Sequence, residues 1–107
     1  MNELAALHCT PLEGHPAMSA TEVSAHLPQA DGWSLTCGAL EKTFRFADYH
    51  RTMAFVNAVA WIAHREDHHP DIAFGYNHCT LRFNTHSVNG ISLNDFICAA
   101  KVDSLNR

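Results

Sequence analysis

The sequence has few basic residues and no long apolar run. Only 7 of its 107 residues are Lys or Arg, against 11 Asp and Glu, and the net charge is -4 with the histidines neutral. The basic residues are scattered, whereas nucleic acids and anionic membrane surfaces both select for a basic face. No stretch approaches the roughly 18 apolar residues of a membrane helix. The sequence therefore predicts neither nucleic acid nor membrane as a partner.

Cysteine motifs and a signal peptide are also missing. The four cysteines are Cys9, Cys37, Cys79 and Cys98. No two of them show the CxxC spacing of zinc ribbons or thioredoxin-like sites. The first twenty residues lack the apolar run of a signal peptide. We therefore expect reduced thiols, most of them small core residues, and a cytoplasmic location.

The length suits one domain, with 47% of the residues apolar and 17% charged. Residues 1–18 contain Pro11, Gly14 and Pro16 and show no clear period, so we interpret them as a loose leader. Residues 19–107 are expected to form the single domain. Its core is modest for its size, and a homo-oligomer would bury more apolar surface.

Caps and periodicity predict three helices. Ser19 and Glu22 fit a capping box, Asp48 fits an N-cap, and Ser92 with Asp95 fits a second capping pattern. The expected helices cover about residues 20–26, 49–65 and 93–104.

Four strands are expected between these helices, over residues 33–35, 39–46, 72–76 and 78–86. In 39–46, Leu40, Lys42, Phe44 and Phe46 share one face, which is typical of a strand with one buried side. The order helix, two strands, helix, two strands, helix predicts an α+β two-layer domain with antiparallel strand pairs.

Histidine is unusually frequent. There are nine, and four lie within residues 64–78. His68 and His69 are placed in a helix-to-strand loop, and His86 ends a strand whose polar face it shares with Asn84. If the two hairpins pair in one sheet, three imidazoles converge on one cleft. Imidazole titrates near neutral pH, so this cluster predicts acid–base chemistry.

The spacing of these residues carries a resemblance. The spaced set is Asp67-His68-His69-Pro70, Tyr76, Thr85-His86 and Asp95. An upstream set of aromatic and small residues is Trp33, Leu40, Phe44, Phe46, Asp48, Tyr49, Phe55, Val59, Ala60 and Ala63. Together they resemble the pterin-4a-carbinolamine dehydratases over about residues 33–105.

The resemblance implies three helices packed on a four-stranded antiparallel sheet, assembled as a homodimer or homotetramer. It implies a lyase that dehydrates 4a-hydroxytetrahydrobiopterin to quinonoid dihydropterin without a metal or other cofactor. That reaction recycles the cofactor of aromatic amino acid hydroxylases, which are possible partners. Catalytic roles fall to His68, His69 and His86. The implied pterin-binding residues are Asp67, Asn84, Thr85, Ser87 and Asp95. Asp95 has two further interpretations, as a group that orients an imidazole and as the capping residue of the last helix.

Two positions depart from the family pattern. Asn89-Gly90 stands where many members have Gly-Gly, but Asn tolerates left-handed geometry, so the turn is expected to survive. His64 stands where many members carry an acidic residue. The loss of this negative neighbour would affect the rate and pH optimum more than the reaction class.

Three other interpretations remain open. Without the resemblance, His68 and His69 could lie in a solvated loop that caps the preceding helix, and His86 could be a strand-end hydrogen-bonding residue. The chain could be a non-catalytic dimerisation module with the same fold, as some relatives are for a transcription factor. Less favoured is a zinc site built from His64, His68, His69 and His86.

Overall fold

The computed structural model of the protein describes residues 3–106. Its strands are β1 (Ser34–Thr36), β2 (Ala39–Arg45), β3 (Asp71–Phe74) and β4 (His78–Phe83). Its α-helices are α1 (Ala20–His26), α2 (Tyr49–Glu66) and α3 (Leu93–Asp103). Short 3-10 turns are η1 (Glu3–Ala6), η2 (Leu27–Gln29), η3 (His86–Val88) and η4 (Ser104–Asn106). This element order confirms the predicted α+β domain.

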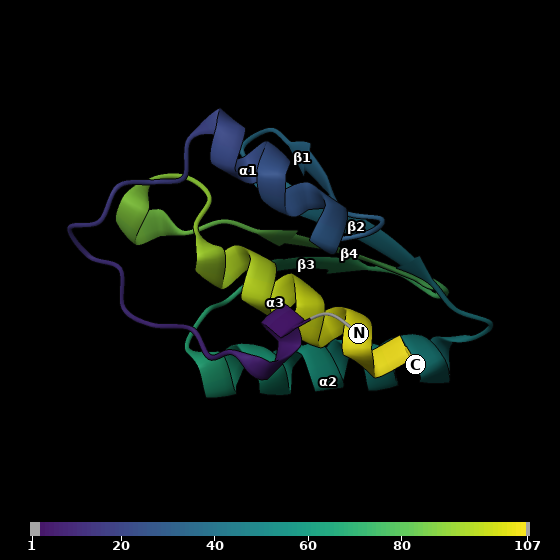
Figure 1. The fold of residues 1–107 in the computed structure, drawn as a ribbon. Coiled ribbons are helices and arrows are strands. Elements are labelled where there is room, and N and C mark those ends of the chain that lie inside the picture. The colour runs from purple at the N-terminus through teal and green to yellow at the C-terminus, as the bar shows by residue number, and fades with distance from the viewer. Residues whose placement is uncertain (1–2, 107) are drawn as a thin grey trace.

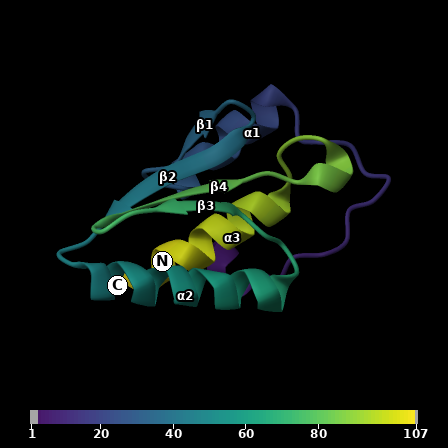
Figure 2. The same cartoon turned by 180° about the vertical axis from the view of Figure 1, so that it is seen from behind.

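The four strands form one antiparallel sheet in the order β1-β2-β4-β3. The helices lie on one side of it (Figure 1), and the view from behind has the strands in front with no helix over them (Figure 2). In β4, every second side chain is buried, namely Cys79, Leu81 and Phe83. The two-residue alternation of this strand therefore matches one helix-covered face and one bare face.

Lys42 lies on the core-facing side of β2, as its place in the alternation predicted. Its ammonium group binds the Asp103 carboxylate at 2.9 Å and lies 4.9 Å from the centre of the Phe44 ring. Asp103 also accepts a hydrogen bond from the Trp33 indole at 3.1 Å. The charge is thus paired at the edge of the core, and the apolar stem packs on aromatic rings.

Helix α3 is buried on almost every side. The sheet, α2 and η1 all pack around it, and each residue from 94 to 100 is buried. The spacing of Leu93, Phe96, Ile97, Ala100 and Leu105 in the sequence predicts a single buried stripe on this helix, but Leu93 and Leu105 are both exposed. A helix enclosed by several elements has no solvent-facing stripe, so periodicity alone cannot mark its buried face.

The segment before α1 differs from the loose leader that we expected. Leu4 in η1 is buried against α3, and the Lys101 ammonium group binds the Ala5 carbonyl at 2.9 Å. The chain then passes the η3 turn on its way to α1 (Figure 1). Isolated contacts with α2 and α3 hold this segment. They leave no period in its sequence, which is why pattern reasoning missed them.

The end of β4 also differs from the expectation. The strand stops at Phe83 rather than at His86. Thr85 instead forms an isolated bridge with Gly90, which closes the η3 turn and takes the chain off the sheet. His86 therefore belongs to a turn, and its neighbours are set by the loop rather than by the strand alternation.

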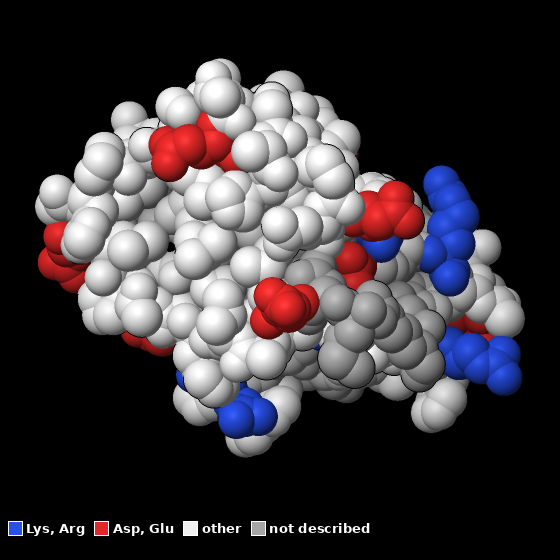
Figure 3. Space-filling view, in the orientation of Figure 1, with Lys and Arg blue, Asp and Glu red and all other residues white. Residues whose placement is uncertain are grey.

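Charged side chains are dispersed on the face seen in Figure 3. Most of that face is uncharged, and the Lys and Arg side chains lie along its lower and right edges. No helix within residues 3–106 combines the length and the apolarity that a membrane span requires.

Candidate active site

The turn after α2 buries His68 in the protein and leaves His69 exposed to solvent. Asp67 caps the helix in a left-handed conformation, with φ of 51°, and its N–H bonds back to α2. The following N–H, of His68, binds the Ala63 carbonyl at 3.1 Å. This sharp turn buries His68 to 9% exposure, whereas His69 stays exposed. Aspartate is among the few residues that tolerate this backbone geometry.

The buried Asp95 carboxylate holds His68. Its Oδ1 lies 2.6 Å from His68 Nε2. Its Oδ2 accepts hydrogen bonds from the Thr85 hydroxyl at 2.8 Å and from the Ser92 amide at 2.9 Å. Asp95 is fully buried, so these protein donors occupy both oxygens. This geometry matches the orienting and capping interpretations of Asp95, and its direct contact with a pterin stays a prediction.

His68 is fixed in its plane as well as at one nitrogen. Its ring stacks on Phe83 with an interplanar angle of 7° and centroids 6.0 Å apart. Because a carboxylate only accepts hydrogen bonds, Nε2 carries the proton that is donated to Asp95. In the neutral ring, this leaves Nδ1 as the nitrogen that can accept a proton or a hydrogen bond.

The turn after β4 brings the second group of predicted residues beside this pair. Thr85 is buried, and its hydroxyl lies 2.7 Å from that of Ser92. His86 and Ser87 follow in η3 and are exposed. Asn89 ends the turn with φ of 56°, the left-handed geometry that we expected it to tolerate.

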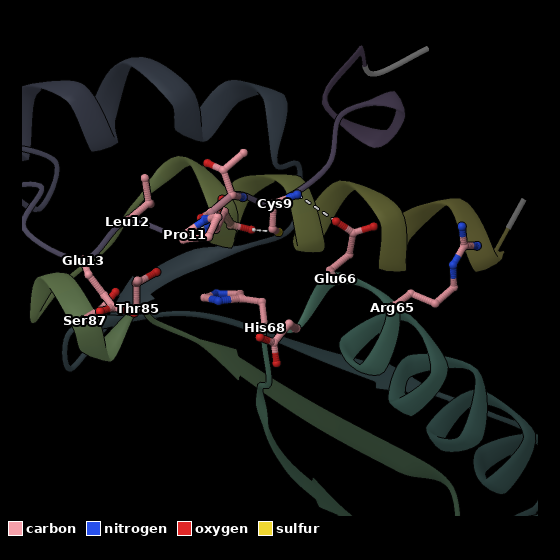
Figure 4. A pocket seen from close by; sticks show the side chains of 12 residues that line it. Cys9, Pro11, Leu12, Glu13, Arg65, Glu66, His68, Thr85 and Ser87 are labelled. Atoms are coloured by element: carbon pink, nitrogen blue, oxygen red, sulfur yellow. Dashed lines mark hydrogen bonds between the residues drawn. The ribbon is translucent and has the colours of Figure 1, made fainter.

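A pocket of about 430 Å³ opens between these two turns (Figure 4). His68, Thr85, Asp67 and Ser87 all line it, the first two buried and the last two exposed. The remaining lining residues are Cys9, Thr10, Pro11, Leu12, Glu13, Arg65, Glu66 and Asn94. Four of the predicted site residues therefore share one cavity of a size that small ligands occupy.

His86 and Asn84 line a second, smaller pocket of about 240 Å³, together with Asn89 and Gly90. Thr85 borders both pockets, so they meet at one side chain. His69 lines neither of them. The structure thus places His68 and His86 in two pockets that share Thr85 and leaves His69 outside both, so the expected convergence of three imidazoles on one cleft is not seen.

No pattern in the sequence predicted that the N-terminal segment would line this pocket. The Cys9 amide binds the Glu66 carboxylate at 2.7 Å, and His8 Nδ1 lies 2.9 Å from the same group. Burial by itself raises the pKa of Glu66. These two hydrogen bonds, with the Lys101 ammonium group 3.8 Å away, outweigh it and lower the net pKa below its usual value. The ionised Glu66 carboxylate therefore binds groups of the protein itself, namely His8, the Cys9 amide and Lys101.

A metal centre is not apparent in the described part of the chain. Within residues 3–106, no group of three or more His, Cys, Asp or Glu side chains is placed to hold a metal ion. His64, one of the four residues considered for zinc, is exposed on α2, with its ring 5.9 Å from that of Trp61.

Comparison with known families settles which family this site belongs to. The model of the family described as pterin 4 alpha carbinolamine dehydratase matches residues 16–105. The chain belongs to this family. The resemblance drawn from the spaced histidines and Asp95 is thereby confirmed, and the family model covers both turns that build the site.

Relatives and solved structures of the pterin-4a-carbinolamine dehydratase family agree with this. A protein of Nitrosospira multiformis named "Putative pterin-4-alpha-carbinolamine dehydratase" is 52% identical, over 98% of this chain and 94% of that protein. A protein of the same name from Stenotrophomonas maltophilia is 53% identical, over 95% and 90%. A crystal structure of a transcriptional coactivator/pterin dehydratase from Brucella melitensis matches with a TM-score of 0.80 and 28% identity, covering 83% of this chain and 97% of that one.

A more distant dehydratase-like structure also matches. It is described as a pterin dehydratase-like protein that is a RuBisCO assembly factor in the alpha-carboxysome. Its TM-score is 0.58 at 27% identity, over 68% of this chain and 84% of that one. The dehydratase fold is therefore shared with proteins whose descriptions name more than one role.

Proposed function

We propose that this chain dehydrates 4a-hydroxytetrahydrobiopterin to quinonoid dihydropterin by histidine acid–base catalysis. The observation that carries the proposal is that His68, paired with the buried Asp95, lines a pocket in a member of the dehydratase family. A cavity of about 430 Å³ has room for a bicyclic pterin, since small-molecule sites commonly measure ~300–1,000 Å³.

The reaction is a loss of water. The bond between C4a and its hydroxyl oxygen breaks, and a double bond forms between C4a and N5. One proton goes to the departing hydroxyl and one leaves N5, so atoms and charge balance without an added redox partner. A positioned acid–base group typically contributes ~10²–10⁴-fold to such a step. Imidazoles suit both transfers near pH 7, and the proposed mechanism uses no metal.

The surroundings of the histidines favour different roles. His68 is buried and tied to Asp95, which suits a group that orients the substrate and presents Nδ1 to it. His69 and His86 are exposed, so both can exchange protons with solvent. We therefore assign the acid and base roles to His69 and His86.

Polar groups around the pocket would hold the pterin. Asp67 and Ser87 line the larger cavity, Asn84 lines the smaller one, and Thr85 stands between them. A ring bound across Thr85 would bring its reacting edge toward both η3 and the turn after α2.

In the cell, the product would be reduced and returned to an aromatic amino acid hydroxylase, in the cytoplasm. We further propose that the protein works as a homodimer or homotetramer. The outer face of the sheet carries no helix, which leaves an extended surface for a second copy (Figure 2).

The test is a stopped-flow dehydration assay with synthetic 4a-hydroxytetrahydrobiopterin, with and without a chelator. Wild type should accelerate the decay well above buffer, and His69→Ala and His86→Ala should each lower kcat by about tenfold or more. His50→Ala is the matched control, because His50 is exposed on α2 away from both pockets. A wild type no faster than buffer would refute the proposal and favour a binding role, as the assembly-factor relative has.

A further inference from the structure

The pocket has a wall that the family model does not include. Residues Cys9–Glu13, which we call the N-terminal wall, supply five of the twelve residues that line the cavity. The family model begins at residue 16. The Nitrosospira relative aligns with 98% of the chain, so its similarity extends through this wall.

Side chains of α2 and α3 anchor the start of the wall, at Cys9 and Thr10. Asn94 pairs with the backbone of Thr10 in both directions. Its Oδ1 accepts from the Thr10 amide at 3.1 Å, and its Nδ2 donates to the Thr10 carbonyl at 2.8 Å. The Cys9 amide binds Glu66 at 2.7 Å. Asn94 directly precedes Asp95, so the same helix start positions the wall and His68.

The N-terminal wall places at the cavity a carboxylate that has no hydrogen-bond or ion-pair partner among the described residues. Three acidic side chains line it, namely Glu13, Glu66 and Asp67. Glu66 is bonded to the Cys9 amide and His8, whereas no side-chain hydrogen bond or ion pair involves Glu13 or Asp67 in the described residues. Asp67 lies next to His68, while Figure 4 shows Glu13 beside Ser87, across the pocket from Arg65.

A pterin offers a complementary edge. Its 2-amino-4-oxopyrimidine ring presents an N3–H and a 2-amino group side by side, two parallel donors. A carboxylate can accept from both at once, as it does from the two parallel donors of an arginine, and such charge-assisted pairs are about twice as strong as neutral ones. The backbone that carries this carboxylate is anchored to α2 and α3 at Cys9 and Thr10, so less of the chain has to be ordered when a ligand binds.

We propose that the N-terminal wall binds the pyrimidine end of the pterin, with the Glu13 carboxylate accepting hydrogen bonds from N3–H and the 2-amino group. This assignment rests on the proposed function, because it presumes a pterin in the pocket. It makes Glu13 a specificity residue that distinguishes a 2-amino ring from a 2-oxo ring.

Binding of two stable probes, 6-methylpterin and 6-methyllumazine, tests this directly. They share N3–H and differ in carrying an amino group or an oxygen at position 2. Wild type should bind the pterin about tenfold more tightly, because the lumazine oxygen faces a carboxylate. Glu13→Gln should weaken pterin binding and narrow the preference to about threefold or less, since its amide can donate to the 2-oxo group.

The matched control is Glu3→Gln, which removes an exposed carboxylate from the same segment outside the pocket and should leave both dissociation constants unchanged. Asn94→Ala should weaken binding of both probes, because it releases the wall. An unchanged pterin-to-lumazine ratio in Glu13→Gln would overturn the assignment, as would a wild type that binds neither probe.

The dehydration assay separates this inference from the proposed function. Wild type that binds 6-methylpterin through Glu13 but does not accelerate dehydration would refute only the function. If wild type dehydrates 4a-hydroxytetrahydrobiopterin and Glu13→Gln leaves KM unchanged, only the assignment of Glu13 as a pterin-binding residue is refuted. In the expected outcome, Glu13→Gln raises KM by about tenfold and changes kcat by less than about twofold.

Discussion

Replacing Asp95 with asparagine should switch the tautomer of His68. The carboxylate now accepts from His68 Nε2, the Thr85 hydroxyl and the Ser92 amide. An amide of the same shape keeps one accepting oxygen, which the Thr85 and Ser92 donors would use. Its NH₂ group would then face Nε2, and two donors cannot pair. The imidazole can restore the bond only by moving its proton to Nδ1, the nitrogen that does not contact residue 95.

The size of the effect follows from this geometry. Asp95→Asn replaces charge-assisted hydrogen bonds with neutral ones in a fully buried site, which should cost about 1–3 kcal/mol of unfolding free energy. Asp95→Ala leaves the Ser92 amide and His68 Nε2 without an acceptor, whereas the Thr85 hydroxyl keeps the Ser92 hydroxyl as a partner. That change should cost about 3–5 kcal/mol. The domain total is expected to be only ~5–15 kcal/mol, so the asparagine variant is the informative one.

Three measurements follow the change, namely urea unfolding, stopped-flow kcat and the nitrogen chemical shifts of the His68 ring by NMR. We expect kcat of Asp95→Asn to fall about 10- to 100-fold, and the shifts to report a proton on Nδ1. Glu22→Gln is the matched control, because Glu22 holds the same capping position on α1 and its carboxylate makes no hydrogen bond to an imidazole; the His26 ring binds the Glu22 backbone carbonyl instead. Wild-type kcat with unchanged nitrogen shifts in Asp95→Asn would show that the carboxylate does not set the tautomer.

Three further predictions concern the supports of the site. Phe83→Leu removes the ring under His68 and should cost about 1 kcal/mol in urea unfolding while broadening the His68 ring signals. The lowered pKa of Glu66 means that its charge stabilises the fold above its usual value of 4.5, and that this contribution is lost as pH falls through the folded pKa. The stability gap between wild type and Glu66→Gln should therefore shrink in acid-unfolding series below about pH 4.5, and a constant gap would contradict this. Finally, the sulfurs of Cys9 and Cys98 lie 3.5 Å apart. Mild oxidation of the Cys37→Ser variant, which lacks the exposed thiol, should therefore form a Cys9–Cys98 disulfide, seen by mass spectrometry as the loss of two hydrogens. If no disulfide forms, the placement of the N-terminal wall against α3 is contradicted.

Local signals predicted the elements well where they depend on neighbours in sequence. The Ser19–Glu22 capping box and the Asp48 N-cap start α1 and α2 where the sequence analysis placed them. The alternation of β2 also holds, with Lys42 included. Signals of this kind arise within one turn of helix or one strand, so a single sequence carries them.

Predictions failed where contacts between distant segments decide the structure. The bridge between Thr85 and Gly90 ends β4 early, and no residue of the strand itself marks that point. Packing on all sides removes the stripe expected for α3. The N-terminal wall is held by Glu66 and Asn94, which lie more than fifty residues away in sequence.

By itself, the sequence determined the family, the candidate site residues and the local backbone geometry around them. The spaced histidines, the helix caps and Asn89 in its left-handed turn are fixed by side-chain type and short-range geometry. Only the tertiary structure decided that Asp95 faces His68 rather than the pocket, and that the segment before α1 closes one side of it. The physical reason is that burial and pairing of polar groups depend on which helices and turns meet in space, and that information is shared among residues far apart in the chain.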